Sequence, residues 1–130
     1  MKTVLLVHDS QASPAPRLQY LEIAGFKVIG LASGSEALRA IASNKPDIVL
    51  TDVLVEGPNG FALCEEIRKQ FEPEDLPVVI VSGIYRGRGY REEAYNVGAQ
   101  EYLRSPVDLD EMVTVVQRLV MPEGGERLAG

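Results

Sequence analysis

Short apolar runs that alternate with amphipathic segments constrain the fold of this chain most. Three of these runs, at residues 4–7, 48–50 and 78–81, contain no polar residue. A strand with one face in water alternates between apolar and polar residues, so continuous apolar runs predict strands that are covered on both faces, as in parallel sheets. We expect five strands near residues 3–8, 27–32, 47–52, 77–82 and 101–104.

Amphipathic segments between and after these runs predict five helices. The first should begin with Ser13 as its N-cap and Pro14 as its first residue, and should end at Gly25. Helical spacing predicts the following core-facing residues, in chain order: Leu18, Tyr20 and Leu21; Ala37, Leu38 and Ile41; Leu63, Ile67 and Phe71; Tyr90, Ala94 and Val97; Met112, Val115, Val116 and Leu119.

Strictly alternating strands and helices predict an α/β fold. We expect a single doubly wound, flavodoxin-like domain with a five-stranded parallel sheet in the order 2-1-3-4-5 and five helices. The domain should span residues 1–121, and the glycine-rich residues 122–130 should form a flexible C-terminal tail.

Composition limits which partners the domain can bind and which cellular compartment suits it. A formal net charge of -6 argues against nucleic-acid binding by this domain. No apolar run approaches the roughly 20 residues of a membrane span, and no leader precedes the first strand pattern, so we expect a cytoplasmic protein with no membrane contact. Cys64 is the only cysteine, and its place in a helical pattern predicts a small packing residue.

Polar residues follow three of the predicted strands. His8 and Asp9 follow the first, Asp52 ends the third and Ser82 ends the fourth. Because the carboxyl ends of parallel strands meet at one edge of the sheet, this is the edge where we expect a site. A carboxylate at a strand end is also typical of a turn or helix cap, so Asp52 has a structural interpretation beside the functional one.

These residues, in this order and spacing, resemble the receiver domain of two-component response regulators over about residues 2–121. The resemblance is carried by five segments: the acidic end of the first strand at 4–9, the strand 46–52 that ends in Asp52, the glycine turn 57–61, Ser82, and the approach to the fifth strand at 98–103. No single segment is specific, but together they are.

The resemblance implies a signalling function with no enzymatic output of its own. Asp52 would accept a phosphoryl group from a histidine kinase or phosphotransfer protein, and Ser82 would hydrogen-bond the new phosphate. Asp9, Asp52 and the backbone carbonyl of Leu54 would hold Mg²⁺. Tyr102 would be the aromatic switch that alters the surface of the fourth helix, fifth strand and fifth helix, where a downstream protein would bind. Tyr102 as an ordinary half-buried strand aromatic is an equally supported interpretation, and homodimerisation through that surface is left open.

Two positions depart from the family pattern. His8 stands in place of one acid of the acidic pair, and Ser105, before Pro106, stands in place of the lysine. His8 is a poor ligand for a hard cation, and a hydrogen-bonded strand-end histidine is its simpler interpretation, so the Mg²⁺ site should be weakened. Arg104 points to the opposite face from Ser105 and is not an automatic substitute.

A replacement cation is also considered among the arginines at 86, 88 and 91, although a solvated loop is the simpler interpretation of this segment. The family's cis peptide could persist at Ser105-Pro106, because only X–Pro bonds adopt cis cheaply.

Because His8 and Ser105 depart from the family pattern, a second function has to be considered. A pseudo-receiver, which binds partners without phosphorylation, would not need the missing acid and lysine. A cofactor-binding enzyme on the same architecture is the weakest alternative, because residues 10–14 lack the glycines of a flavin phosphate loop and no Asp-x-His-x-x-Gly segment for cobalamin is present.

Overall fold

The computed structural model describes residues 1–83 and 88–121, and nothing is described of the side chain of residue 88. Its strands are β1 (Thr3–Val7), β2 (Lys27–Leu31), β3 (Ile48–Asp52), β4 (Val78–Ser82) and β5 (Glu101–Arg104). Its helices are α1 (Ala15–Ile23), α2 (Gly34–Asn44), α3 (Gly60–Arg68), α4 (Arg88–Asn96) and α5 (Leu109–Val120). Within these described residues, no helix has the length and apolar character needed to cross a bilayer.

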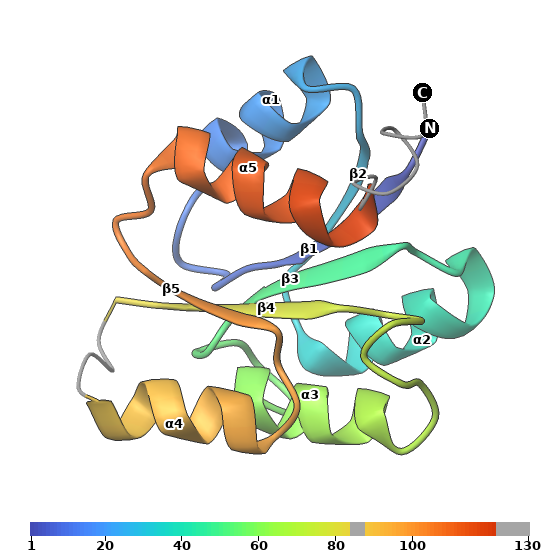
Figure 1. Ribbon diagram of the computed structural model, residues 1–130, viewed down its shortest axis with the longest axis vertical. Helices are drawn as coiled ribbons and strands as arrows, with labels where there is room; N and C mark the ends of the chain where they lie inside the picture. The colour runs from blue at the N-terminus through green and yellow to red at the C-terminus, as the bar shows by residue number, and fades with distance from the viewer. Residues whose placement is uncertain (84–87, 122–130) are drawn as a thin grey trace.

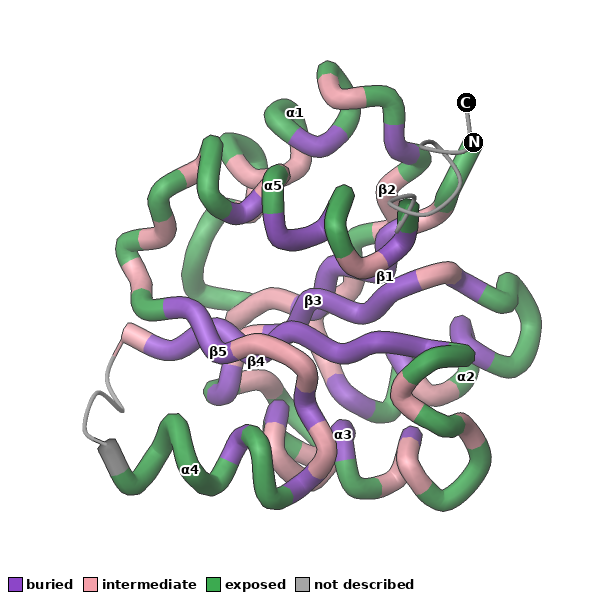
Figure 2. Tube along the Cα trace, in the orientation of Figure 1, coloured by how far each residue is buried: buried purple, intermediate pink, exposed green. Residues whose placement is uncertain are grey.

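The strands form one parallel sheet in the order β2-β1-β3-β4-β5. Helices α1 and α5 cover one face of this sheet, and α2, α3 and α4 cover the other (Figure 1). Two buried apolar clusters fill the spaces between sheet and helices, and the central strands are buried along their length (Figure 2). The predicted α/β class, strand order and five helices are therefore confirmed.

Most predicted core positions are buried or packed against the core, but two tyrosines are not. Tyr20 is 43% exposed, because it lies off the stripe formed by Leu18 and Leu21 on α1. Tyr90, in the first turn of α4, is 42% exposed, as suits a ring whose polar tip prefers water. The expectation that both face the core was wrong.

The start of α1 also differs from the prediction. The helix begins at Ala15 with Pro14 as its N-cap, not at Pro14 with Ser13 as the cap. Ser13 still serves the helix, because its Oγ accepts a hydrogen bond from the N–H of Ala15 at 3.2 Å. Gly25, at φ +100°, follows the helix end as expected.

Cys64 is a packing residue, as predicted. It is buried on α3, and its thiol donates to the backbone oxygen of Val97 at 3.4 Å. Burial raises the pKa of Cys64 to about 11, so the group is a neutral thiol at physiological pH.

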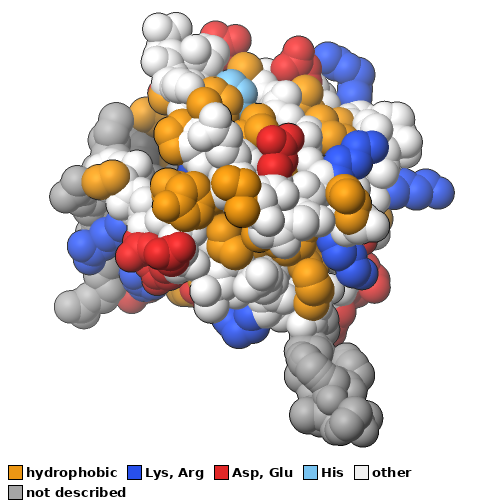
Figure 3. Space-filling model, turned by 90° about the horizontal axis from the view of Figure 1, so that it is seen from above, with side chains coloured by type: hydrophobic (Ala, Val, Ile, Leu, Met, Phe, Trp, Pro, Cys, Tyr) orange, Lys and Arg blue, Asp and Glu red, His pale blue; other side chains and the backbone are white. Residues whose placement is uncertain are grey.

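The outer face of α1 and α5 is mixed in character. Apolar side chains gather near the middle of this face with acidic atoms among them, and Lys and Arg side chains lie toward its margins (Figure 3).

A close backbone contact places α3 beside the end of β3. Asn59 caps α3 by accepting from the N–H of Ala62, and the N–H of Gly60 donates to the backbone oxygen of Val53 at 2.9 Å. A Cβ on Gly60 would lie 2.5 Å from the backbone oxygen of Asp52. The glycine therefore allows the helix start to approach the residue that ends β3.

We expect Gly60→Ala to lower the free energy of unfolding by about 1–3 kcal/mol, because the added methyl group must push the α3 start away from β3. Urea unfolding followed by circular dichroism measures this. Gly89→Ala is the matched control: nothing lies within 4 Å of its Cβ position on α4. That substitution should raise stability by about 0.5–1 kcal/mol through helix propensity. Equal effects at the two positions would contradict the close-contact explanation.

Candidate functional site

A pocket of about 480 Å³ opens at the carboxyl edge of the sheet. It lies where β1, β3 and β4 end and the following loops begin, as the sequence predicted. Of the predicted site residues it brings together Asp9, Asp52, Leu54, Ser82 and Ser105. The rest of its lining is Ala12, Ser13, Pro16, Arg17, Val53, Val81, Gly83, Pro106, Val107 and Leu109.

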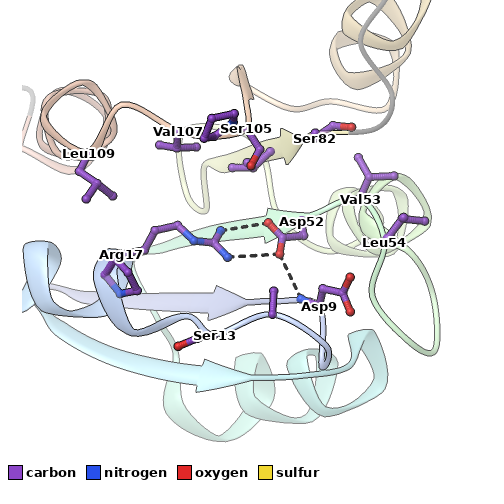
Figure 4. Close-up of a pocket in the computed structure, with 15 residues that line it drawn as sticks. Asp9, Ser13, Arg17, Asp52, Val53, Leu54, Ser82, Ser105, Val107 and Leu109 are labelled. Atoms are coloured by element: carbon purple, nitrogen blue, oxygen red, sulfur yellow. Dashed lines mark hydrogen bonds and ion pairs between the residues drawn. The ribbon is translucent and has the colours of Figure 1, made fainter.

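Asp52 forms an ion pair with Arg17 at the centre of this pocket. The guanidinium donates from Nη1 to Oδ1 at 3.0 Å and from Nη2 to Oδ2 at 3.3 Å, so one planar group spans both carboxylate oxygens (Figure 4). The side chains are only 13% and 17% exposed for Arg17 and Asp52. The pair is therefore mostly shielded from water, where loss of either partner leaves a poorly solvated charge.

The sequence analysis missed Arg17. It looked for a replacement cation at residues 86–91, next to Ser82 in the chain. Arg17 is the third residue of α1, the helix that starts just beyond the end of β1. A basic residue in the first turn of such a helix, close to the edge where the carboxylates gather, was the available signal.

Asp9 lies on the other side of Asp52 from Arg17 (Figure 4). Its backbone N–H donates to Asp52 Oδ2 at 3.0 Å, and its own Oδ1 accepts from the N–H of Gln11 at 2.9 Å. Its carboxylate lies on the same side as Val53 and Leu54. Two carboxylates and a nearby backbone carbonyl are oxygen donors of the kind that a hard divalent cation takes, with water as the remaining ligands.

The protein contribution to such a cation site is small. In the described part of the chain, no group of three or more His, Cys, Asp or Glu side chains could hold a metal ion. His8 is absent from the pocket lining, and its Nδ1 lies 3.1 Å from the backbone oxygen of Asp9.

Ser105 and Ser82 lie across the pocket from the ion pair (Figure 4). The N–H of Ser105 donates to the backbone oxygen of Ser82 at 2.9 Å, and the Ser105-Pro106 bond is cis, as expected. Arg104 is exposed and lines a different hollow, together with Arg91 and Tyr102. Arg104 therefore does not replace the missing lysine.

Of the three arginines considered as replacements, Arg91 is the one whose side chain is described, and it does not line the pocket. Arg86 lies outside the described residues, and Arg88 begins α4 with a side chain that is not described. Arg91 lies over the ring of Tyr102, with its Cζ 5.4 Å from the ring centroid.

Tyr102 is more deeply buried than the half-buried strand aromatic that one interpretation of the sequence assumed. It is 3% exposed and belongs to the apolar cluster on the α4 side of the sheet, and Ser82, on the neighbouring strand, is 4% exposed. The ring of Tyr102 therefore lies inward in this structure.

The shielding of the Arg17–Asp52 pair predicts a measurable coupling. In a double-mutant cycle of Arg17→Met and Asp52→Asn, we expect a coupling free energy of about 1–3 kcal/mol in urea unfolding. The control is the exposed pair of Arg118 and Glu101, at 2.7 Å with Arg118 55% exposed. Arg118→Met with Glu101→Gln should give a coupling below about 1 kcal/mol. A coupling near zero at the pocket would contradict a firm ion pair there.

Comparison with known proteins agrees with this geometry. The family model for the response regulator receiver domain matches residues 4–117. The chain is 38% identical over 97 residues to the DNA-binding transcriptional regulator NtrC of Escherichia coli, covering 75% of this chain and 20% of that protein. It is 30% identical over 105 residues to the response regulator PleD of Caulobacter vibrioides, covering 81% of this chain and 23% of that protein. The chain thus spans about a fifth of the length of these relatives.

Solved structures give the same result. The receiver domain of a Francisella response regulator superimposes with a TM-score of 0.85 at 25% identity, covering 95% of this chain and 99% of that one. A CheY-like receiver domain protein from Methanospirillum hungatei gives a TM-score of 0.84 at 25% identity, covering 97% and 98%. With its fold, its strand-end carboxylates and a family match over most of its length, the chain belongs to the response regulator receiver domains.

Proposed function

We propose that this domain accepts a phosphoryl group on Asp52 in two-component signalling. The observation that carries the proposal is the place of Asp52, at the end of a buried strand, within an otherwise largely apolar pocket, where it pairs with a cation and faces Ser82 and Ser105 across the pocket. Phosphoryl transfer needs little covalent chemistry from a protein beyond a positioned nucleophile and stabilisation of charge.

In the proposed reaction an oxygen of Asp52 attacks phosphorus and forms an acyl phosphate. The bond from phosphorus to the leaving group breaks at the same time, and a histidine nitrogen of the donor keeps the electron pair. At least one of the two contacts between Arg17 and Asp52 must loosen during this step, because Arg17 contacts both carboxylate oxygens. Ser82 would then donate a hydrogen bond to the phosphate.

Receiver domains generally bind Mg²⁺ at their acidic pocket, and we propose that Asp9, Asp52 and the carbonyl of Leu54 hold it here. The bound cation would supply positive charge to the phosphoryl oxygens. The described donors supply two carboxylates without a third, so we expect weak binding that needs millimolar Mg²⁺.

Receiver domains exchange signals with histidine kinases and with downstream effector domains. For this chain we propose a cytoplasmic kinase or phosphotransfer partner and no catalytic output. The apolar middle of the face in Figure 3 suits a protein partner better than a nucleic acid, which needs a basic surface. For the output we propose the hollow between α4, β5 and the start of α5, which Arg91, Tyr102 and Glu111 line.

Intact mass after incubation with phosphoramidate tests the proposed function. We expect a single phosphate adduct that requires Mg²⁺ and is lost in Asp52→Asn, because the amide is not a nucleophile of the same kind. Asp47→Asn is a matched control at a carboxylate that accepts from the N–H of Thr3 at the opposite end of the strands. An adduct that survives in Asp52→Asn would contradict the assignment.

A pseudo-receiver remains the alternative function, favoured by Ser105 in place of the lysine. It would give no adduct with phosphoramidate or with a kinase. Partner binding would then be unchanged by Asp52→Asn.

A further inference from the structure

Phosphorylation of Asp52 would concentrate negative charge in a pocket that already holds Asp9. Among the described residues that line the pocket, Arg17 is the one basic side chain. Ser105 has no charge to offer, Arg104 is exposed elsewhere, and Arg91 lies over Tyr102. Of the side chains that the structure describes around the pocket, Arg17 is therefore the cation placed to balance the charge of the phosphoryl group, together with any bound metal ion.

We propose that Arg17 is the catalytic cation of this site, contacting Asp52 before transfer and the phosphoryl oxygens during and after it. The role that a strand-end lysine would have is thus taken by an arginine from α1. This inference rests on the proposed phosphorylation of Asp52.

The geometry of the guanidinium suits both states. Nη1 and Nη2 lie 3.0 and 3.3 Å from the two oxygens of Asp52, so a phosphoryl group bonded to either oxygen would form next to a donor. The planar fork can contact one carboxylate oxygen and one phosphoryl oxygen at once, which a point-like ammonium does less well.

Arg17 also leaves the proposed metal side of the pocket open. It approaches Asp52 from the side opposite to the Asp9 carboxylate and Leu54 (Figure 4). The two positive charges would therefore act on different phosphoryl oxygens instead of competing for one place.

The first turn of α1 holds the arginine in position. Pro16 precedes it within the turn and lines the same pocket, and Leu21, one turn further on, is fully buried against the sheet. The fixed φ of proline and this anchored helix restrict the directions in which the 13% exposed side chain can point.

The main test compares phosphoramidate labelling rates at saturating Mg²⁺. Arg17→Met should slow labelling of Asp52 by about 10- to 100-fold, the loss typical of one charge-assisted contact. Arg17→Lys should recover part of the rate. Arg39→Met, at an exposed arginine on α2 that does not line the pocket, should have no effect. Urea unfolding of each variant establishes that it is folded.

Repeating the Arg17 substitution in a second variant distinguishes the loss of a charge from damage to the fold. Ser105→Lys introduces a cation on the opposite wall of the same pocket. In that background Arg17→Met should slow labelling less than threefold, because the lysine supplies the charge. An equally large loss with and without Lys at position 105 would overturn the proposal and leave Arg17 a structural residue.

Beryllium fluoride binding, followed by fluorine NMR, gives a readout that needs no transfer step. Its complex with Asp52 should be weakened at least tenfold by Arg17→Met and not by Arg39→Met. Unchanged binding, or faster labelling of Arg17→Met than of the natural chain, would overturn the proposal. The second result would mean that Arg17 slows the phosphorylation of Asp52.

The outcomes also separate this inference from the proposed function. If the natural chain is labelled at Asp52 and Arg17→Met is labelled at the same rate, the inference fails and the function stands. If the natural chain is not labelled but Ser105→Lys is, both fail, because Arg17 then does not supply the charge that transfer requires.

Discussion

Burial of both faces of the sheet is the constraint on which the site depends. Helices cover the strands on each side, so a polar side chain within the central strands must find a partner inside the protein. Thr51 is the example: it is fully buried, and its hydroxyl donates to the backbone oxygen of Asp52 at 2.9 Å. Charged side chains are therefore confined to the ends of these strands, where they reach water or a partner. The carboxyl edge collects Asp9 and Asp52 for this reason, before any function is considered.

Charge balance at that edge is the next requirement. A carboxylate as shielded as Asp52 is costly unless it is paired, and here the partner comes from α1, 35 residues earlier in the chain. The guanidinium and the backbone N–H of Asp9 together give Asp52 three donors. Ser105 can therefore be neutral without leaving the carboxylate unpaired.

Local patterns predicted the features that depend on local physics. Apolar runs fixed the strands to within a residue or so, glycines and caps marked helix ends, and strand ends indicated the pocket. Errors arose where a side chain's environment depends on distant elements. Tyr20 and Tyr90 are half covered because of where their helices meet the sheet, and Arg17 contacts Asp52 because the first turn of α1 lies at the carboxyl edge of the sheet. Spacing along the chain can place the first turn of a helix near this edge, but it does not show which side chains meet there.

The element that supplies the cation determines which parts of the domain a change at Asp52 would reach. A lysine at position 105 would tie the phosphoryl group to the loop between β5 and α5, next to Tyr102 and the hollow beside it. An arginine on α1 would tie it instead to a helix that packs against β2 and α5. Ser82 is then the described link from the pocket toward β5, through the hydrogen bond between its backbone oxygen and Ser105. With the charge held from α1, a change at Asp52 would reach the Tyr102 side through β4 and the Ser82–Ser105 contact, and the α1–α5 side through Arg17.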